Sequence, residues 1–312
     1  MSILSNPFFF TPAAATGRHT RGIFGFGHNW AAGAKTAITN LVSTAGVVSS
    51  DVTGVGTARS YIGCATYGED KAIFAYGAIG ASYQNMSNLV SNEGVVASDV
   101  TGVGTSRQIE DGGVGYGEDR GIFVFGVTSW PTMTAVSNLV SSSGVIATDT
   151  TGVGTARTNV MSCSYDEDKA IYAFGATPSL TNLSNLVSNS GVVASDVTGV
   201  GTARYGGGGL GYGEDKGIIA FGYIGSPTYS TSISNLISNS GVVASDTTGV
   251  GTGRQTISGT TYDSDKGMFA YGTPGGGSGL NTQNLVSSSG VVASDSSGVG
   301  FLASERGSNS FA

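Results

Sequence analysis

The chain has 312 residues, of which 52 are glycine, and charged residues make up 11% of it. Ordinary soluble domains contain roughly 25% charged residues, so the composition excludes a charge-rich disordered chain. The net charge of −7 without a lysine- or arginine-rich block argues against a nucleic-acid binder, and no apolar run reaches the ~18 residues of a transmembrane helix.

The first residues do not resemble a secretion signal. Residues 1–15 (MSILSNPFFFTPAAA) have no cationic start, and their apolar run is short and flanked by prolines. We therefore expect the protein to stay where it is made or to leave in a particle by cell lysis. Residues 1–20 are interpreted as an N-terminal arm in which Phe8, Phe9 and Phe10 dock onto a partner. The alternative is an arm folded over the first unit of its own chain.

Residues 21–312 consist of six copies of one unit. Asn-Leu-Val or Asn-Leu-Ile recurs at intervals of 47–50 residues, and each copy continues with a glycine, an aspartate and Thr-Gly-Val-Gly-Thr-Ala-Arg or a close variant. The tripeptides begin at Asn40, Asn88, Asn138, Asn185, Asn235 and Asn284. A second block, Tyr-Gly-Glu-Asp-Lys-Ala-Ile-Phe-Ala-Tyr-Gly at 67–77, also recurs. Such self-similarity is the signature of a repeat architecture.

Each unit is predicted to contain four short antiparallel strands. In the second unit these are 58–66, 71–76, 87–91 and 95–98, with turns built from Gly, Glu, Asp, Asn and Ser. The run 71–76 (KAIFAY) is apolar almost throughout, which indicates a strand covered on both faces. No segment has a sustained helical spacing of apolar residues, so helix should be nearly absent.

A period near 49 residues with four strands is typical of a propeller blade. The prediction is an all-β chain whose residues 21–312 form a six-bladed β-propeller of four-stranded antiparallel blades, closed by the C-terminal strand. Residues 301–311 would supply the missing inner strand of the first unit, with Phe311 aligned on Tyr165 and Ala303 at the arginine position. Residues 8–15 are the alternative for that place. A trimeric β-solenoid fibre is the competing architecture.

The unit resembles the kelch-type repeat. Its apolar strand ending in Tyr-Gly or Phe-Gly is similar to the kelch strand ending in a double glycine, and its arginine stands where kelch units often carry one. It departs from the pattern in having one glycine there and no tryptophan on the outer strand. Glycine-rich kelch-like arrays also resemble hypothetical virion proteins of marine tailed phages. That resemblance implies a capsid- or tail-associated virion component, assembled in the host cytoplasm or otherwise extracellular.

Most charged residues occupy repeated positions, so blade construction explains them. The acids outside these positions are Glu93, Glu110, Asp111 and Glu305. Because an enzyme needs a constellation in one place, we expect no catalytic residue and no cofactor. A carboxylate pair present in one unit only and facing a central funnel would instead favour a propeller enzyme or lectin.

Metal and thiol chemistry are not predicted either. The acidic turns, such as 166–168, lack the spacing of a calcium loop and carry their own lysine, so we expect turn caps and no metal. His19 and His28 stand without a cysteine or carboxylate cluster. Cys64 and Cys163 fall in units two and four, too far apart for a disulfide, which predicts buried free thiols.

The loops between the second and third strands vary from unit to unit and lie on one face, since successive strands alternate in direction. They carry the candidate binding residues Trp30, Tyr83, Trp130, Tyr223 and Tyr229. A constant scaffold with one variable loop set indicates a binding face, and unconstrained drift is the alternative.

The predicted function is a non-enzymatic structural and binding propeller that mediates attachment or protein–protein contacts. Its expected partners are other virion subunits and a host surface glycan, with no nucleic acid and no membrane insertion. A soluble glycan-binding, lectin-like propeller or a propeller enzyme is the alternative.

Overall fold

The computed structural model describes residues 19–275 and 277–312. Within these residues the regular structure is entirely β-strand, arranged in small antiparallel sheets, which confirms the predicted all-β class. The described part of the chain holds no helix long and apolar enough to cross a membrane.

Six three-stranded sheets repeat one topology, in which a middle strand pairs with an inner and an outer strand. Sheet 1 contains β25 (Gly307–Phe311), β1 (Arg21–Gly25) and β4 (Thr39–Val42). Sheet 2 contains β5 (Gly63–Tyr67), β6 (Lys71–Ala75) and β9 (Ser87–Val90). Sheet 3 contains β10 (Gly113–Tyr116), β11 (Arg120–Val124) and β14 (Ser137–Val140). Sheet 4 contains β15 (Met161–Tyr165), β16 (Lys169–Ala173) and β17 (Ser184–Val187). Sheet 5 contains β18 (Gly208–Tyr212), β19 (Lys216–Gly225) and β20 (Tyr229–Ile237). Sheet 6 contains β21 (Ser258–Tyr262), β22 (Lys266–Ala270) and β23 (Gln283–Val286).

Short extra strands extend several of the variable loops into hairpins. Beside sheet 1, β24 (Ala303–Ser304), β2 (His28–Asn29) and β3 (Ala34–Lys35) form a small sheet. The loops of sheets 2 and 3 form β7 (Ala78–Ile79) with β8 (Ser82–Tyr83), and β12 (Val127–Ser129) with β13 (Thr132–Met133). In sheet 5 the corresponding residues continue β19 and β20.

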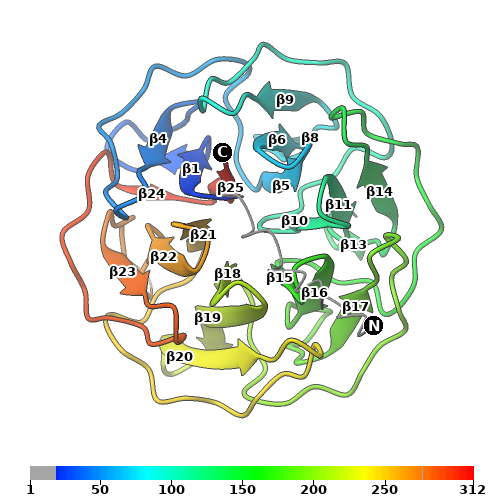
Figure 1. The fold of residues 1–312 in the computed structure, drawn as a ribbon. Coiled ribbons are helices and arrows are strands. Elements are labelled where there is room, and N and C mark those ends of the chain that lie inside the picture. The colour runs from blue at the N-terminus through cyan, green and yellow to red at the C-terminus, as the bar shows by residue number, and fades with distance from the viewer. Residues whose placement is uncertain (1–18, 276) are drawn as a thin grey trace, which may run out of the picture.

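The six sheets lie around a common centre, with the inner strands nearest to it (Figure 1). Each inner strand contacts the inner strands of two neighbouring sheets, in the cyclic order β25, β5, β10, β15, β18, β21 and back to β25. The C-terminal strand β25 pairs with β1 along its whole length, with Phe311 opposite Arg21. The predicted pairing of residues 301–311 with the first unit is therefore confirmed, and the alternative, residues 8–15, lies outside the described residues.

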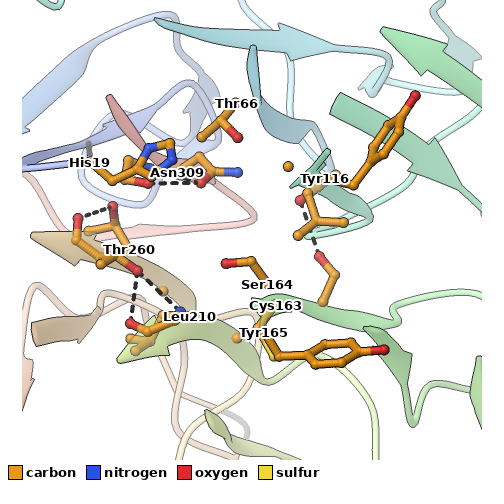
Figure 2. A pocket seen from close by; sticks show the side chains of 18 of the residues that line it. His19, Thr66, Tyr116, Cys163, Ser164, Tyr165, Leu210, Thr260 and Asn309 are labelled. Atoms are coloured by element: carbon orange, nitrogen blue, oxygen red, sulfur yellow. Dashed lines mark hydrogen bonds between the residues drawn. The ribbon is translucent and has the colours of Figure 1, made fainter. Parts of the chain in front are cut away.

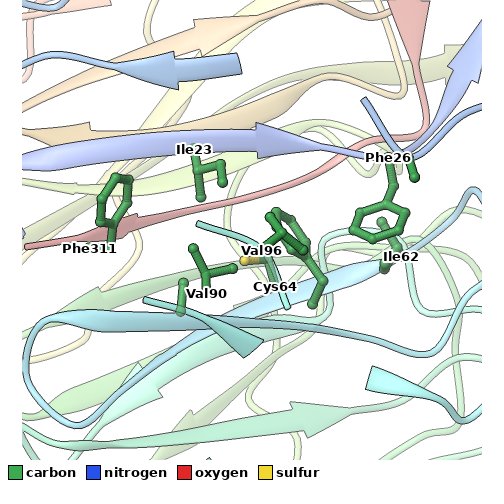
Figure 3. Packing of buried hydrophobic residues seen from close by; sticks show 10 residues of the cluster. Ile23, Phe26, Ile62, Cys64, Val90, Val96 and Phe311 are labelled. Carbon is green, nitrogen blue, oxygen red and sulfur yellow. The ribbon is translucent and has the colours of Figure 1, made fainter. Parts of the chain in front are cut away.

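The hydrophobic core is divided into six clusters, each between two adjacent sheets. Between sheets 1 and 2, Ile23, Val90 and Phe311 are fully buried and pack together (Figure 3). Each middle strand faces a cluster on both sides. That explains why its sequence is apolar almost throughout and does not alternate.

The predicted fourth strand is not formed as a strand, so each principal sheet has three strands and not four. In sheet 2 the segment after β9 pairs with it only at isolated bridges, between Val90 and Val96 and between Ser87 and Val100. The side chain of Asn88 occupies the space between these bridges. Its Nδ2 donates to the Ala97 carbonyl at 3.0 Å and to Asp99 Oδ1 at 2.9 Å. A side-chain amide thus replaces the regular backbone ladder.

The repeated arginine is buried and connects neighbouring sheets. Arg59 donates to Asn88 Oδ1 at 2.7 Å and to the Tyr76 carbonyl at 2.8 Å, both in its own sheet. Its guanidinium also lies 4.4 Å from the centre of the Phe26 ring, in sheet 1. Equivalent contacts are made by Arg107, Arg157, Arg204 and Arg254. The prediction that these charges are structural is consistent with this burial.

The sixth arginine position is filled from an unexpected residue. The backbone of Ala303 stands at the arginine position, because its carbonyl accepts from Gly272 N at 2.9 Å as the Arg107 carbonyl does from Gly77 N. The guanidinium comes from Arg306, three residues later. It donates to Asn40 Oδ1 at 2.8 Å and lies 4.4 Å from the Tyr271 ring centre. Alignment of the repeats placed Ala303 at the arginine position and did not identify Arg306 as the source of the guanidinium.

Candidate binding site at the centre of the loop face

In four of the six units a non-glycine residue in the left-handed conformation stands two positions after the arginine position. Tyr61, Asn159, Thr256 and Glu305 all have φ between 51° and 57°, a left-handed conformation that interrupts the inner strand. This is why the predicted strand 58–66 begins only at Gly63. Backbone hydrogen bonds join these turns around the axis, for example from Tyr61 N to the Glu305 carbonyl at 3.1 Å.

These turns surround a depression of about 540 Å³ on the face that carries the variable loops. Its lining residues come from sheets 1, 2, 4, 5 and 6 and are Trp30, Tyr61, Asn159, Tyr205, Gln255, Thr256, Thr273, Pro274, Gly277, Ser278, Ser304 and Glu305. Glu305 is the one charged side chain in this described lining. The rest is aromatic, hydroxyl, amide or apolar, a mixture typical of sites for small polar ligands.

Trp30 is held in place on the rim of the depression. Its Nε1 donates to Ser304 Oγ at 2.9 Å, and its ring meets that of His28 edge-on, with 4.9 Å between centroids. A Cβ atom on Gly279 would lie 2.1 Å from the indole Cδ1, so only glycine leaves room for the ring there. Trp30 is 38% exposed, which leaves an aromatic surface available to a ligand.

Glu305 is held by a lysine and a tyrosine at the wall of the depression. Lys35 Nζ lies 2.8 Å from Glu305 Oε2 and 5.4 Å from the centre of the Tyr61 ring. Burial, followed by the nearby charges of Glu305 and Glu110, raises the pKa of Tyr61, so its hydroxyl stays protonated. The ammonium, the carboxylate and the phenol thus form one polar group.

Glu110 lies in the same region and is almost completely buried, with 4% of its surface exposed. Asn159 Nδ2 donates to its Oε2, while Oε1 is buried without a hydrogen-bond partner. Burial and the charge of Glu305 raise the pKa of Glu110 to about 8, and Lys35 opposes them. A carboxyl group with this pKa is mainly protonated at neutral pH.

Asp111 follows Glu110 and extends towards the axis. Its Oδ2 accepts from Gly209 N, in sheet 5, at 3.2 Å, and burial raises its pKa well above the ordinary value. Three of the four acids outside the repeated positions therefore come together near the centre. The fold thus brings Glu305 close to Glu110, from which it is distant in the sequence.

The structure separates the five aromatic residues predicted from the loops. Trp30 lines the depression, and Tyr223 stacks on the lining residue Tyr205 with 5.0 Å between ring centroids. Tyr229 lies 6.3 Å beyond Tyr223. Tyr83 and Trp130 belong to hairpins that do not line the depression, and Trp130 is 70% exposed. Phe8, Phe9 and Phe10 lie outside the described residues.

Sequence reasoning missed Tyr61, Lys35, Asn159 and Tyr205 as site residues. The sequence signal that could have identified some of them was their position within the repeated unit. Tyr61, Asn159 and Glu305 all stand two residues after the arginine position, where the units differ from one another. A residue that varies at a fixed point of a repeated backbone is a candidate for function.

A second cavity runs along the axis between the inner strands (Figure 2). It measures about 80 Å³ and is lined mainly by glycine and small polar residues such as Thr66, Ser164 and Thr260. This space is large enough for a few water molecules and too small for a sugar-sized ligand. Cys163 lines it as a buried free thiol, and Cys64 is also free and buried, as predicted.

The repeated acidic turns make local ion pairs. Lys71 Nζ lies 2.6 Å from Asp70, and Lys216 Nζ lies 2.5 Å from Asp215. In the described residues no group of three or more His, Cys, Asp or Glu side chains is placed to hold a metal ion. A scan of the chain against protein-family models and a search of the curated proteins both found no match.

Proposed function

We propose that the six sheets form a six-bladed β-propeller of the kelch-like kind, with three-stranded blades and an irregular fourth segment. Six equivalent topologies, the cyclic order of contacts between inner strands and the pairing of β25 with β1 support this proposal. The depression then lies at the mouth of the propeller axis, where loops from several blades meet.

The propeller acts as a non-enzymatic binding protein, and its ligand at the depression is a saccharide. The observation that carries this is the lining itself. It combines the aromatic faces of Trp30, Tyr61 and Tyr205 with the hydroxyl and amide groups of Asn159 and Gln255. Aromatic faces pack against the apolar side of a sugar ring, while hydroxyl and amide groups bond its hydroxyls.

The protein works as a component of a phage particle, where such binding mediates attachment to a host surface glycan. The resemblance to glycine-rich virion proteins and the N-terminal Phe8–Phe10 segment as a dock for other virion subunits support this assignment. Mass spectrometry of purified particles tests it. We expect the chain at a stoichiometric level, and its absence from particles would reject the assignment.

The saccharide site is tested with two tryptophans on one face. Trp30→Ala should weaken saccharide binding at least about tenfold, because buried aromatic contacts often contribute 2 kcal/mol or more. Trp130→Ala is the matched control and should leave affinity unchanged. A glycan array followed by calorimetry on the best ligand measures both. Equal loss in the two variants, or none in either, would place the site elsewhere.

A second candidate is a soluble lectin-like propeller or a propeller enzyme that acts on glycans. The convergence of Glu110 and Glu305 favours it, because a pair of carboxyl groups usually carries out the acid–base chemistry of glycan hydrolysis. Release of reducing ends from the bound glycan, abolished by Glu305→Gln, would support the enzyme. Unchanged glycan after prolonged incubation would support the binding protein.

A further inference from the structure

The depression is acidic as well as aromatic. Glu305 is the only charged group in its described lining. Glu110 is buried behind that lining and accepts from the lining residue Asn159, whereas Asp111 lines the cavity along the axis. Lys35 is the one ammonium paired with these acids in the described residues. The guanidinium of Arg306, next in sequence, is engaged away from them by Asn40 and two backbone carbonyls.

Two observations bear on what these carboxyl groups can bind. The Oε1 atom of Glu110 is buried without any partner, although such atoms are normally hydrogen-bonded. Glu305 already binds an ammonium, that of Lys35, in a position 5.4 Å from the face of the Tyr61 ring. A carboxylate beside an aromatic face is a favourable place for a cation.

We infer that the saccharide taken up in the depression carries a free, protonated amino group, which binds at Glu305. This inference rests on the proposed saccharide site and narrows its ligand to amino sugars. The ligand's ammonium competes with Lys35 for the Glu305 carboxylate and lies against the faces of Tyr61 or Tyr205. Acidic sugars are repelled by the same carboxylate.

Burial and Glu305 hold Glu110 mainly in its protonated form, and the groups that face it are Tyr61, Tyr205, Glu305, Lys35 and Asp111. Because the charge of Glu305 contributes to the raised pKa of Glu110, a cation bound at Glu305 offsets that contribution and lowers the pKa of Glu110.

The experiment compares four small ligands at about pH 6, where amino groups are protonated. D-glucosamine, N-acetyl-D-glucosamine, D-glucose and D-glucuronate are titrated into the full chain by calorimetry, with n-propylammonium as an amine that is not a sugar. We expect glucosamine to bind about tenfold more tightly than glucose, since a hydrogen bond to a charged group contributes roughly 1.5–3 kcal/mol. Glucuronate should bind most weakly.

Three variants test which residues produce the preference for glucosamine over glucose. Glu305→Gln should reduce the ratio between glucosamine and glucose affinities to about one. Lys35→Ala should tighten glucosamine binding, because it removes the internal competitor. Glu93→Gln is the same chemical change at an exposed carboxylate outside the depression and should change nothing. Thermal unfolding establishes that each variant is folded, and the opposite signs at Glu305 and Lys35 exclude a general loss of structure.

The outcomes separate the two proposals. Equal affinity for glucose and glucosamine would overturn the amino-sugar inference and leave the saccharide site in place. Binding of n-propylammonium without any saccharide would overturn the proposed function and support the cation site at Glu305. An unchanged glucosamine preference in Glu305→Gln would overturn the assignment of the cation to this carboxylate.

Discussion

At the scale of single residues, this protein uses charge mainly inside the structure. Arg157 is fully buried and donates to Asn185 Oδ1 at 2.5 Å and to the Phe174 carbonyl at 3.0 Å. Burial lowers its pKa to about 10, so it stays protonated at neutral pH. Asp196, 3.6 Å away, supplies a compensating charge. A buried charge satisfied in this way is costly to interrupt.

We therefore predict that Arg157→Ala lowers the free energy of unfolding by about 3–5 kcal/mol, because it leaves Asn185 Oδ1 and the Phe174 carbonyl without their buried donor. Thermal and denaturant unfolding measure the loss. Lys216→Ala removes an exposed cation and should have little effect. Saccharide binding should persist in both variants below their unfolding temperatures. A stable Arg157→Ala protein that had lost binding would contradict the structural role.

Glu110 makes stability depend on pH. Its pKa rises from the ordinary 4.5 to about 8, so the folded chain binds this proton more tightly than the unfolded chain does. Between these values unfolding releases a proton, and the contribution of Glu110 to stability therefore falls as pH rises. Asp111 acts in the same direction, because burial also raises its pKa.

We predict that the midpoint of thermal unfolding decreases from about pH 5 to about pH 8 and that Glu110→Gln makes this decrease shallower. The double variant Glu110→Gln, Asp111→Asn should flatten it further. Glu93→Gln, at an exposed position, should keep the slope of the natural chain. A midpoint that rises through this pH range, or an unchanged slope in the double variant, would show that these carboxyl groups are not buried as described.

At the scale of elements, the last strand holds the two ends together. β25 pairs with β1 in sheet 1 and contacts the inner strands β5 and β21 of the two neighbouring sheets. It therefore borders the two core clusters that lie between sheet 1 and its neighbours. Phe311 is fully buried between sheets 1 and 2, and Arg306 supplies the sixth buried guanidinium. One strand therefore contributes contacts to three sheets.

We predict that a chain lacking residues 303–312 loses cooperative unfolding, because sheets 1, 2 and 6 then expose apolar surface. Circular dichroism and binding of a hydrophobic dye measure this loss. A synthetic peptide with residues 303–312, added in excess, should restore the cooperative transition. A truncated chain that unfolds like the full one would show that β25 is dispensable.

At the scale of the whole molecule, the proposed function divides the chain into a propeller and an N-terminal arm. Residues 2–12 carry three successive phenylalanines, each of which contributes roughly 1.5–3 kcal/mol when buried. We predict that deleting residues 2–12 leaves the unfolding midpoint of the propeller unchanged and prevents the chain from joining particles. Calorimetry and particle purification measure the two effects. A loss of several degrees would instead place the arm against its own first unit.

Much of the scaffold was predictable from the sequence, because the residues that form the strands and turns recur in each unit. The repeat period, the apolar middle strands and the alignment of Phe311 with Tyr165 indicated six equivalent units and the pairing of the chain ends. The fourth strand was predicted wrongly. The sequence pattern shows a strand there, whereas the Asn88 side chain takes the backbone carbonyl that a regular ladder would use.

The site depended on tertiary structure. The repeats identified which residues build the units. Glu110, Asp111 and Glu305 stood outside the repeated positions, and the sequence did not show that they lie close together. Their meeting follows from the arrangement of sheets around one centre, which brings the left-handed turns of distant units together. The packing of units likewise brings in Arg306, which supplies the sixth guanidinium from three residues beyond the arginine position. Local sequence determines the backbone of each unit, and only the packing of units decides which unrepeated side chains lie close together.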